Sequence, residues 1–89
     1  MKNALKMKLI DGVFELSEMN EIILTMIDKK IQFHELNSFR KLVQHNEKDE
    51  KQQDRIEELK KERQLFIEYI NSNINENFKI NSEIKIQTL

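Results

Sequence analysis

The sequence predicts an α+β fold, mainly helical, in which a long antiparallel helical hairpin covers a two-stranded antiparallel ribbon made by the termini. Three observations lead to this β-α-α-β order. Apolar and polar residues alternate over about 4–10 and again over about 78–88. Between them, two segments carry apolar residues at three- and four-residue spacing, as amphipathic helices do. Because the chain reverses direction at each short connection, the two strands are antiparallel and can pair.

The first strand is indicated by three apolar residues that alternate with two lysines over 5–9. Asp11-Gly12 follows it, and this dipeptide is typical of turns. Val13 and Phe14 resume the apolar pattern after the predicted turn.

The first helix is predicted over about 18–35, with an extension to 45 left open. Ser17 is a suitable N-cap, because its hydroxyl can accept a hydrogen bond from a free amide of the first turn. Asn37-Ser38 is a weak break in the pattern. Asn46 suits a left-handed helix end, and Asp49 can cap the next helix. The apolar face of this helix comprises Met19, Ile22, Ile23, Met26, Ile27 and Ile31.

The second helix is predicted over about 49–71. Its apolar seam comprises Ile56, Leu59, Phe66 and Ile70. Arg63 occupies the seam position between Leu59 and Phe66, where the heptad pattern would otherwise have an apolar residue. The apolar face widens towards the end of the helix, where one neighbouring helix cannot cover it. Asparagines end this helix, and the second strand follows at about 78–88. The ribbon residues expected to face the hairpin are Leu5, Met7, Leu9, Ile80, Ile84 and Ile86.

An all-α alternative remains open at this point. Nothing between 38 and 56 forbids a helix, so a single helix over 18–70 could form an elongated coiled-coil dimer. The sequence does not decide whether residues 36–50 are helix or loop, or whether the strands pair within one chain or between chains.

Composition argues against most kinds of chemistry. The 89 residues include no Cys and one Gly, which excludes thiolate chemistry, disulfides and glycine-rich phosphate loops. His34 and His45 are the two histidines, and eleven residues correspond to roughly 16 Å along a helix, too far for one metal ion. We therefore expect no enzyme and assign no catalytic, cofactor-binding or metal-binding residue. Six Met and aromatic positions are instead expected in the core: Met19, Met26, Phe33, Phe39, Phe66 and Tyr69.

Charge is balanced, with 15 Lys and Arg against 16 Asp and Glu. Residues 47–63 mix both signs, which is typical of a solvated helical face. Lys2, Lys6 and Lys8 form a small basic patch that we interpret as protection of a sheet edge. Nucleic acid is therefore not the expected partner. The densest apolar stretch, 22–27, is too short for a membrane span, and we expect a cytoplasmic protein.

Four segments carry a resemblance: LIDGVF at 9–14, KIQFHEL at 30–36, RIEELKKERQLFI at 55–67 and KINSEIKI at 79–86. In these segments and their order, the chain resembles a group of short, uncharacterised proteins from Bacteroidota-type bacteria. The resemblance implies a shared fold, a helical hairpin flanked by terminal strands, and no known activity.

These observations predict a small non-enzymatic interaction or adaptor protein that forms a homodimer. The dimer is expected to pack through the apolar half of the second helix, and residues 79–87 are expected to pair across the dimer or to accept a partner's strand. A single chain of this size gains little more from apolar burial than ordering the chain costs, so self-association is a natural source of stability. A protein partner could also bind at a strand edge or on the second helix. The alternative is a nucleic-acid-associated regulator, such as an antitoxin-like or mobile-element accessory protein. The candidate interface comprises Leu65, Phe66, Tyr69, Ile70, Ile84 and Ile86.

Overall fold

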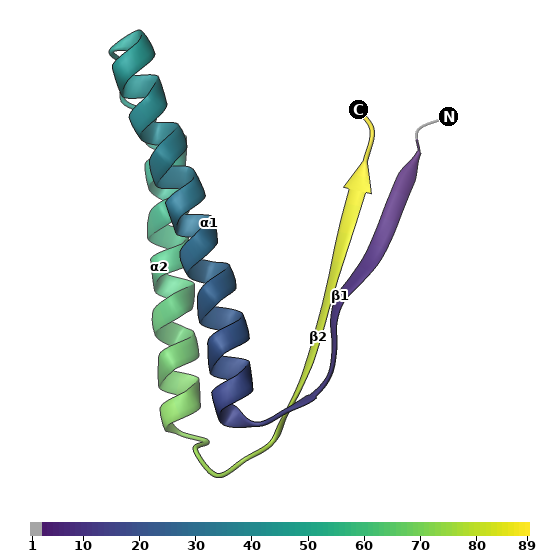
Figure 1. Ribbon diagram of the computed structural model, residues 1–89. Helices are drawn as coiled ribbons and strands as arrows, with labels where there is room; N and C mark the ends of the chain where they lie inside the picture. The colour runs from purple at the N-terminus through teal and green to yellow at the C-terminus, as the bar shows by residue number, and fades with distance from the viewer. Residues whose placement is uncertain (1–2) are drawn as a thin grey trace.

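The computed structural model describes residues 3–89 and contains four elements in the order strand, helix, helix, strand (Figure 1). These are β1 (Ala4–Phe14), α1 (Leu16–His45), α2 (Glu50–Asn71) and β2 (Phe78–Gln87). The strands pair antiparallel within the chain, and the helices form a hairpin. The predicted fold class, mainly helical α+β with β-α-α-β order, is confirmed.

The molecule has the shape of a flat V. Its Cα atoms extend over 49 × 39 × 15 Å. One arm is the helical hairpin and the other is the ribbon, and the two arms meet where α1 begins and α2 ends (Figure 1). Asn3 and Thr88 lie side by side at the far end of the ribbon arm, where the N–H of Thr88 donates to the carbonyl of Asn3.

α1 begins at Leu16, one residue before the predicted cap. Glu15 is the N-cap, and its backbone N–H donates to Oε1 of Glu18 at 3.1 Å. The prediction of Ser17 as the cap is therefore wrong: the acidic residue three positions after Glu15 satisfies the backbone at the helix start, and Ser17 lies inside the first turn. α1 then continues unbroken through Asn37 and Ser38 to His45.

The hairpin turn depends on two capping residues. Asn46 has φ 52°, the left-handed conformation expected for it, and its N–H donates to the carbonyl of Leu42 at 2.9 Å. Asp49 caps α2, since its Oδ1 accepts from the N–H of Gln52 at 3.2 Å. The chain therefore reverses over residues 46–49, and a single continuous helix is not observed.

β1 carries a bulge that alters the predicted face. The register shifts by one between Lys8 and Ile10, and Leu9 has no partner on β2. After this extra residue, Ile10 lies opposite Ser82 on the apolar face. The expectation that Leu9 faces the hairpin is therefore wrong, because one inserted residue moves every later side chain of β1 to the other face.

The predicted turn at Asp11-Gly12 is also absent. Asp11 pairs with Asn81 and Gly12 pairs with Ile80, so β1 continues to Phe14. Gly12 has no positive φ, and a Cβ there would lie 3.4 Å from the Phe14 ring. Pairing with a strand distant in sequence outweighs the local turn preference, and the Phe14 ring covers the backbone that glycine leaves bare.

Two hydrophobic clusters hold the molecule together. The first, which we call the junction, joins hairpin to ribbon through buried Met19, Ile70 and Phe78. Around it pack Phe14, Leu16, Ile23, Phe66 and Ile80. The second cluster lies within the hairpin and comprises Ile31, Ile56 and Leu59, with Ile27 beside them.

The hairpin covers less of the ribbon than predicted. It covers the junction end, where Phe78 is buried and Ile80 is half-buried. Leu5, Met7 and Ile86, which were expected to face the helices, are exposed. The two arms diverge from the junction, so the helices are too far from the other end of the ribbon to bury it (Figure 1).

Candidate protein interface

Exposed apolar side chains are the main surface feature of the described residues. Over residues 3–89, six hydrophobic residues are buried, whereas fifteen large hydrophobic residues are exposed. Scattered exposed apolar residues are normal, but a continuous set on one face marks an interaction surface. One such set lies on each arm, and a further group of exposed apolar residues, Leu36, Phe39, Leu42 and Val43, lies in the last part of α1.

The first set lies on the hairpin. Met19, Met26 and Phe33 are seven residues apart and therefore follow one stripe of α1. Met19 is buried in the junction, but Met26 and Phe33 are 40% and 52% exposed. Lys30 lies beside them, with its Nζ 4.8 Å from the centre of the Phe33 ring.

α2 carries two further exposed apolar residues, on the side that meets the ribbon. The ring of Tyr69 meets the ring of Phe78 edge to face at 5.9 Å. Leu65 precedes Tyr69 by one turn and therefore continues the same stripe. Both side chains are more than half exposed. We call Met26, Phe33, Leu65 and Tyr69 the hairpin stripe.

The second set lies at the far end of the ribbon. Leu5 is opposite Ile86 and Met7 is opposite Ile84, so all four side chains share one face. Leu5, Met7 and Ile86 are exposed, and Ile84 is half-buried. We call these four residues the open end of the ribbon.

The six predicted interface residues do not form one surface. Ile70 is buried in the junction and Phe66 packs against it, so both already contact their own chain. Leu65 and Tyr69 belong to the hairpin stripe, whereas Ile84 and Ile86 belong to the open end on the other arm. The interface itself stays a prediction.

The core predicted for Met and aromatic residues is only partly correct. Met19 is buried and Phe66 is half-buried. Met26, Phe33, Phe39 and Tyr69 are exposed, which contradicts their predicted place in the core. The seven-residue spacing of Met19, Met26 and Phe33 was the signal for a second apolar stripe. When all apolar residues of α1 are treated as one broad face packed on α2, this second stripe is hidden.

Polar residues join the two helices along their contact. His34 is half-buried, and its Nδ1 lies 2.5 Å from Oε1 of Gln52. The Nε2 atom of His34 is buried without a partner among the described residues. Arg63, at the interrupted seam position, donates from Nε to Oδ1 of Asp28 at 2.9 Å. These contacts link α1 and α2 through polar groups in addition to the apolar cluster between them.

The histidines lie apart on α1, with His45 exposed in its last turn. Within residues 3–89, no group of three or more His, Cys, Asp or Glu side chains is arranged to hold a metal ion. In the same part of the chain, no helix has the length and apolar content to cross a membrane.

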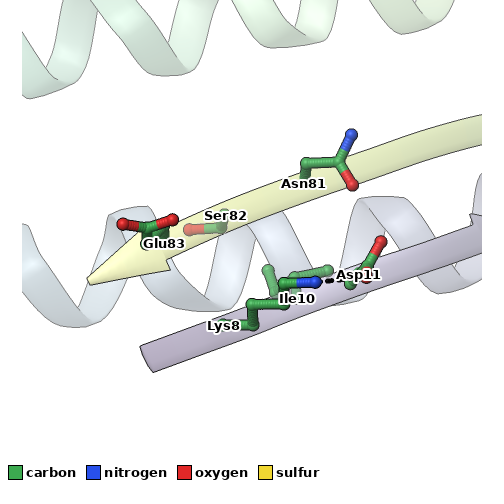
Figure 2. Close-up of a pocket in the computed structure, with 6 residues that line it drawn as sticks. All are labelled: Lys8, Ile10, Asp11, Asn81, Ser82 and Glu83. Atoms are coloured by element: carbon green, nitrogen blue, oxygen red, sulfur yellow. Dashed lines mark ion pairs between the residues drawn. The ribbon is translucent and has the colours of Figure 1, made fainter. Parts of the chain in front are cut away.

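A shallow depression of about 410 Å³ lies over the β1 bulge (Figure 2). Its polar rim includes Lys8, Asp11 and Glu83. Lys8 and Asp11 lie 3.7 Å apart, and the side chains of both are more than half exposed. Such solvated groups lack the burial that tunes residues for catalysis. We therefore assign the depression to the bulge geometry of the ribbon.

The basic patch predicted near the chain start extends onto β2. Lys6 and Lys8 lie on the polar face of β1, and Lys6 is directly opposite Lys85. Lys2 lies outside the described residues.

Comparison of the chain with protein-family models, with curated proteins and with solved structures gives no match. The geometry of the chain itself is therefore the basis for a function.

Proposed function

We propose that this protein is a small, non-enzymatic interaction protein of the cytoplasm that acts as a homodimer. One observation carries the proposal: the open end of the ribbon keeps the alternation of a buried sheet face, yet no residue among 3–89 covers it. A two-stranded ribbon is marginal in water unless more strands or a covering element stabilise it. A second copy supplies that stabilisation.

The hairpin stripe supports an adaptor role. Its residues lie on the other arm from the open end, so a dimer formed at the ribbon leaves them accessible. Exposed aromatic and Met side chains are the residue types most enriched at protein contacts. We therefore assign the stripe to a protein partner and the open end to self-association.

The mass of the protein in solution tests the homodimer. Light scattering coupled to size exclusion should give twice the chain mass of 10.8 kDa at about 100 µM. Ile86→Glu should convert the dimer to a monomer, because it places a charge on the open end. Val13→Glu is the matched control, since Val13 is 70% exposed and lies on the opposite face of the ribbon. A monomer at about 100 µM for the unaltered chain contradicts the proposal.

A second candidate function is a nucleic-acid-associated regulator, antitoxin-like or accessory to a mobile element. The observation that favours it is the cross-strand pair of Lys6 and Lys85, because like charges directly opposite each other destabilise a ribbon and an anion would relieve the repulsion. Titration of labelled duplex DNA at several salt concentrations is the test. Binding that weakens steeply with salt, and weakens again in Lys6→Gln/Lys85→Gln, supports this function.

A further inference from the structure

Within residues 3–89, no strand pairs with the outer edge of β2. Thr88 donates from its N–H to the carbonyl of Asn3 at 3.1 Å, so the backbone groups of Thr88 point at β1. Backbone direction alternates along a strand, and β2 carries no bulge. The N–H and C=O groups of Asn81, Glu83, Lys85 and Gln87 therefore point away from β1, towards the outer edge.

The outer edge of β1 is less suited to pairing. The bulge at Leu9 interrupts its row of backbone groups. Pairing of β1 with a second β1 about Met7 would also place Lys6 opposite Lys8 of the other copy, which repels. Lysines and bulges are the devices by which proteins protect sheet edges.

Charge restricts how two copies of β2 can pair. The apolar faces align only in registers that place even-numbered residues opposite even-numbered residues. A two-fold axis at Glu83 or at Lys85 sets each of these charges against itself, and an axis at Ser82 sets Lys79 against Lys85. An axis at Ile84 instead sets Glu83 of each copy against Lys85 of the other, twice in the dimer.

One other register also brings opposite charges together. An axis at Asn81 sets Lys79 against Glu83 of the second copy. That register uses residues 78–84, and it brings the second strand to Phe78, which is 6% exposed and packed on the hairpin. The register about Ile84 uses residues 81–87, which lie in the part of β2 beyond its junction end, where the two arms diverge (Figure 1). Burial therefore favours the axis at Ile84.

We propose that two copies of this protein pair β2 against β2 about a two-fold axis at Ile84, so that Glu83 of each copy faces Lys85 of the other in a four-stranded antiparallel sheet. The inference rests on the proposed homodimer and specifies its contact. In this sheet, Ile84 lies beside Ile84 of the second copy and Ile86 lies beside its Ser82. These lateral contacts bury part of the open end of each ribbon against the other copy.

Disulfide trapping tests the register, and the chain has no cysteine of its own. Glu83 and Lys85 exchange backbone hydrogen bonds in the proposed sheet, so Ile84 forms a non-hydrogen-bonded pair with its symmetry mate. The Cα atoms of such a pair are about 4.5 Å apart, which suits a disulfide. Ile84→Cys should therefore form a covalent dimer under mild oxidation. Asn81→Cys is the matched control, because its two copies are roughly 20 Å apart in this register.

Charge reversal gives a second readout that leaves the apolar residues intact. Glu83→Lys and Lys85→Glu each place two like-charged pairs at the contact and should raise the dimer Kd about ten-fold or more. The double variant Glu83→Lys/Lys85→Glu restores both pairs with reversed sign, and its Kd should return to within about three-fold of the original value. Sedimentation equilibrium measures all four proteins.

The outcomes separate this inference from the homodimer on which it rests. Covalent trapping at 84 together with recovery in the double variant supports the register. A dimer that traps at 81 instead, or that ignores both charge reversals, overturns the register and leaves the homodimer intact. An unaltered chain that stays monomeric overturns both.

Discussion

The two ends of the ribbon have the same alternating sequence pattern and opposite surroundings. At the junction end, Phe78 is buried against Met19 and Ile70. At the open end, Leu5 and Ile86 form an equivalent cross-strand pair that is half exposed. The difference shows that alternation defines a face of a sheet without providing the cover for it. An uncovered apolar face is where a small protein gains most from a partner, because that contact buries area the chain alone leaves in water.

The largest expected effect separates these two ends directly. Phe78→Ala should lower the free energy of unfolding by about 3–5 kcal/mol, since it removes a buried aromatic ring that connects hairpin and ribbon. Ile86→Ala is the control and should cost less than about 1 kcal/mol, measured in dilute solution where the chain is monomeric. Urea unfolding followed by circular dichroism measures both. Equal losses would show that the junction does not anchor the ribbon.

Ile84 and Lys85 are neighbours on opposite faces of β2, so substitutions there compare a half-buried position with an exposed one. Ile84→Asp should cost about 2–3 kcal/mol, because it places a charge on the half-buried apolar face. Lys85→Asp should leave the monomer within about 0.5 kcal/mol, because Lys85 is exposed and lies opposite Lys6. The thermal midpoint of each variant in dilute solution is the measurement. Similar shifts at 84 and 85 would contradict the strand.

The tip of the hairpin is the part of the helical arm farthest from the junction. Asn46→Ala should cost about 1 kcal/mol. The Cβ of alanine is strained at the left-handed φ of 52°, and alanine lacks the side-chain hydrogen bonding by which Asn tolerates this conformation. Asn46→Gly is the control and should be equal to or more stable than the original, since glycine adopts this conformation freely. Calorimetry of the two variants decides; a loss with Gly as large as with Ala would indicate that the Asn side chain, and not φ, sets the turn.

The smallest expected effect concerns the polar contact between the helices. Arg63→Met should cost about 0.2–1 kcal/mol and less at high salt, because the side chains of Arg63 and Asp28 are 37% and 45% exposed and water screens the pair. Arg55→Met is the control, since Arg55 pairs with Glu58 within α2 and should matter less. Urea midpoints in low and high salt compare them. A cost well above this range would show that the hairpin depends on the ion pair more than on Ile31, Ile56 and Leu59.

The sequence predicted the elements because their signals are local. Spacing of apolar residues located both helices, and Asn46 and Asp49 were recognisable as candidate caps, although the sequence left residues 36–50 undecided between helix and loop. Alternation located both strands and the apolar face shared by Leu5, Met7, Ile84 and Ile86.

The candidate site was predictable only in part. Leu65 and Tyr69 were identified from the width of an apolar helix face and Ile86 from the alternation of the second strand, and all three are exposed. Phe66 and Ile70 were identified by the same signal but are used by the junction. A wide apolar face predicts that two neighbours cover it, and the sequence does not specify which neighbour belongs to the same chain.

The sequence by itself determined the order of elements, their amphipathic patterns and the candidate caps Asn46 and Asp49, since each depends on residues within a few positions of one another. Only the tertiary structure decided the bulge at Leu9, the continuation of β1 through Asp11 and Gly12, and the divergence of the two arms. These features arise from pairing and packing between residues more than 50 positions apart, such as Gly12 with Ile80 and Met19 with Phe78. Contacts of that range outweigh local preference because they bury apolar area and satisfy backbone hydrogen bonds together.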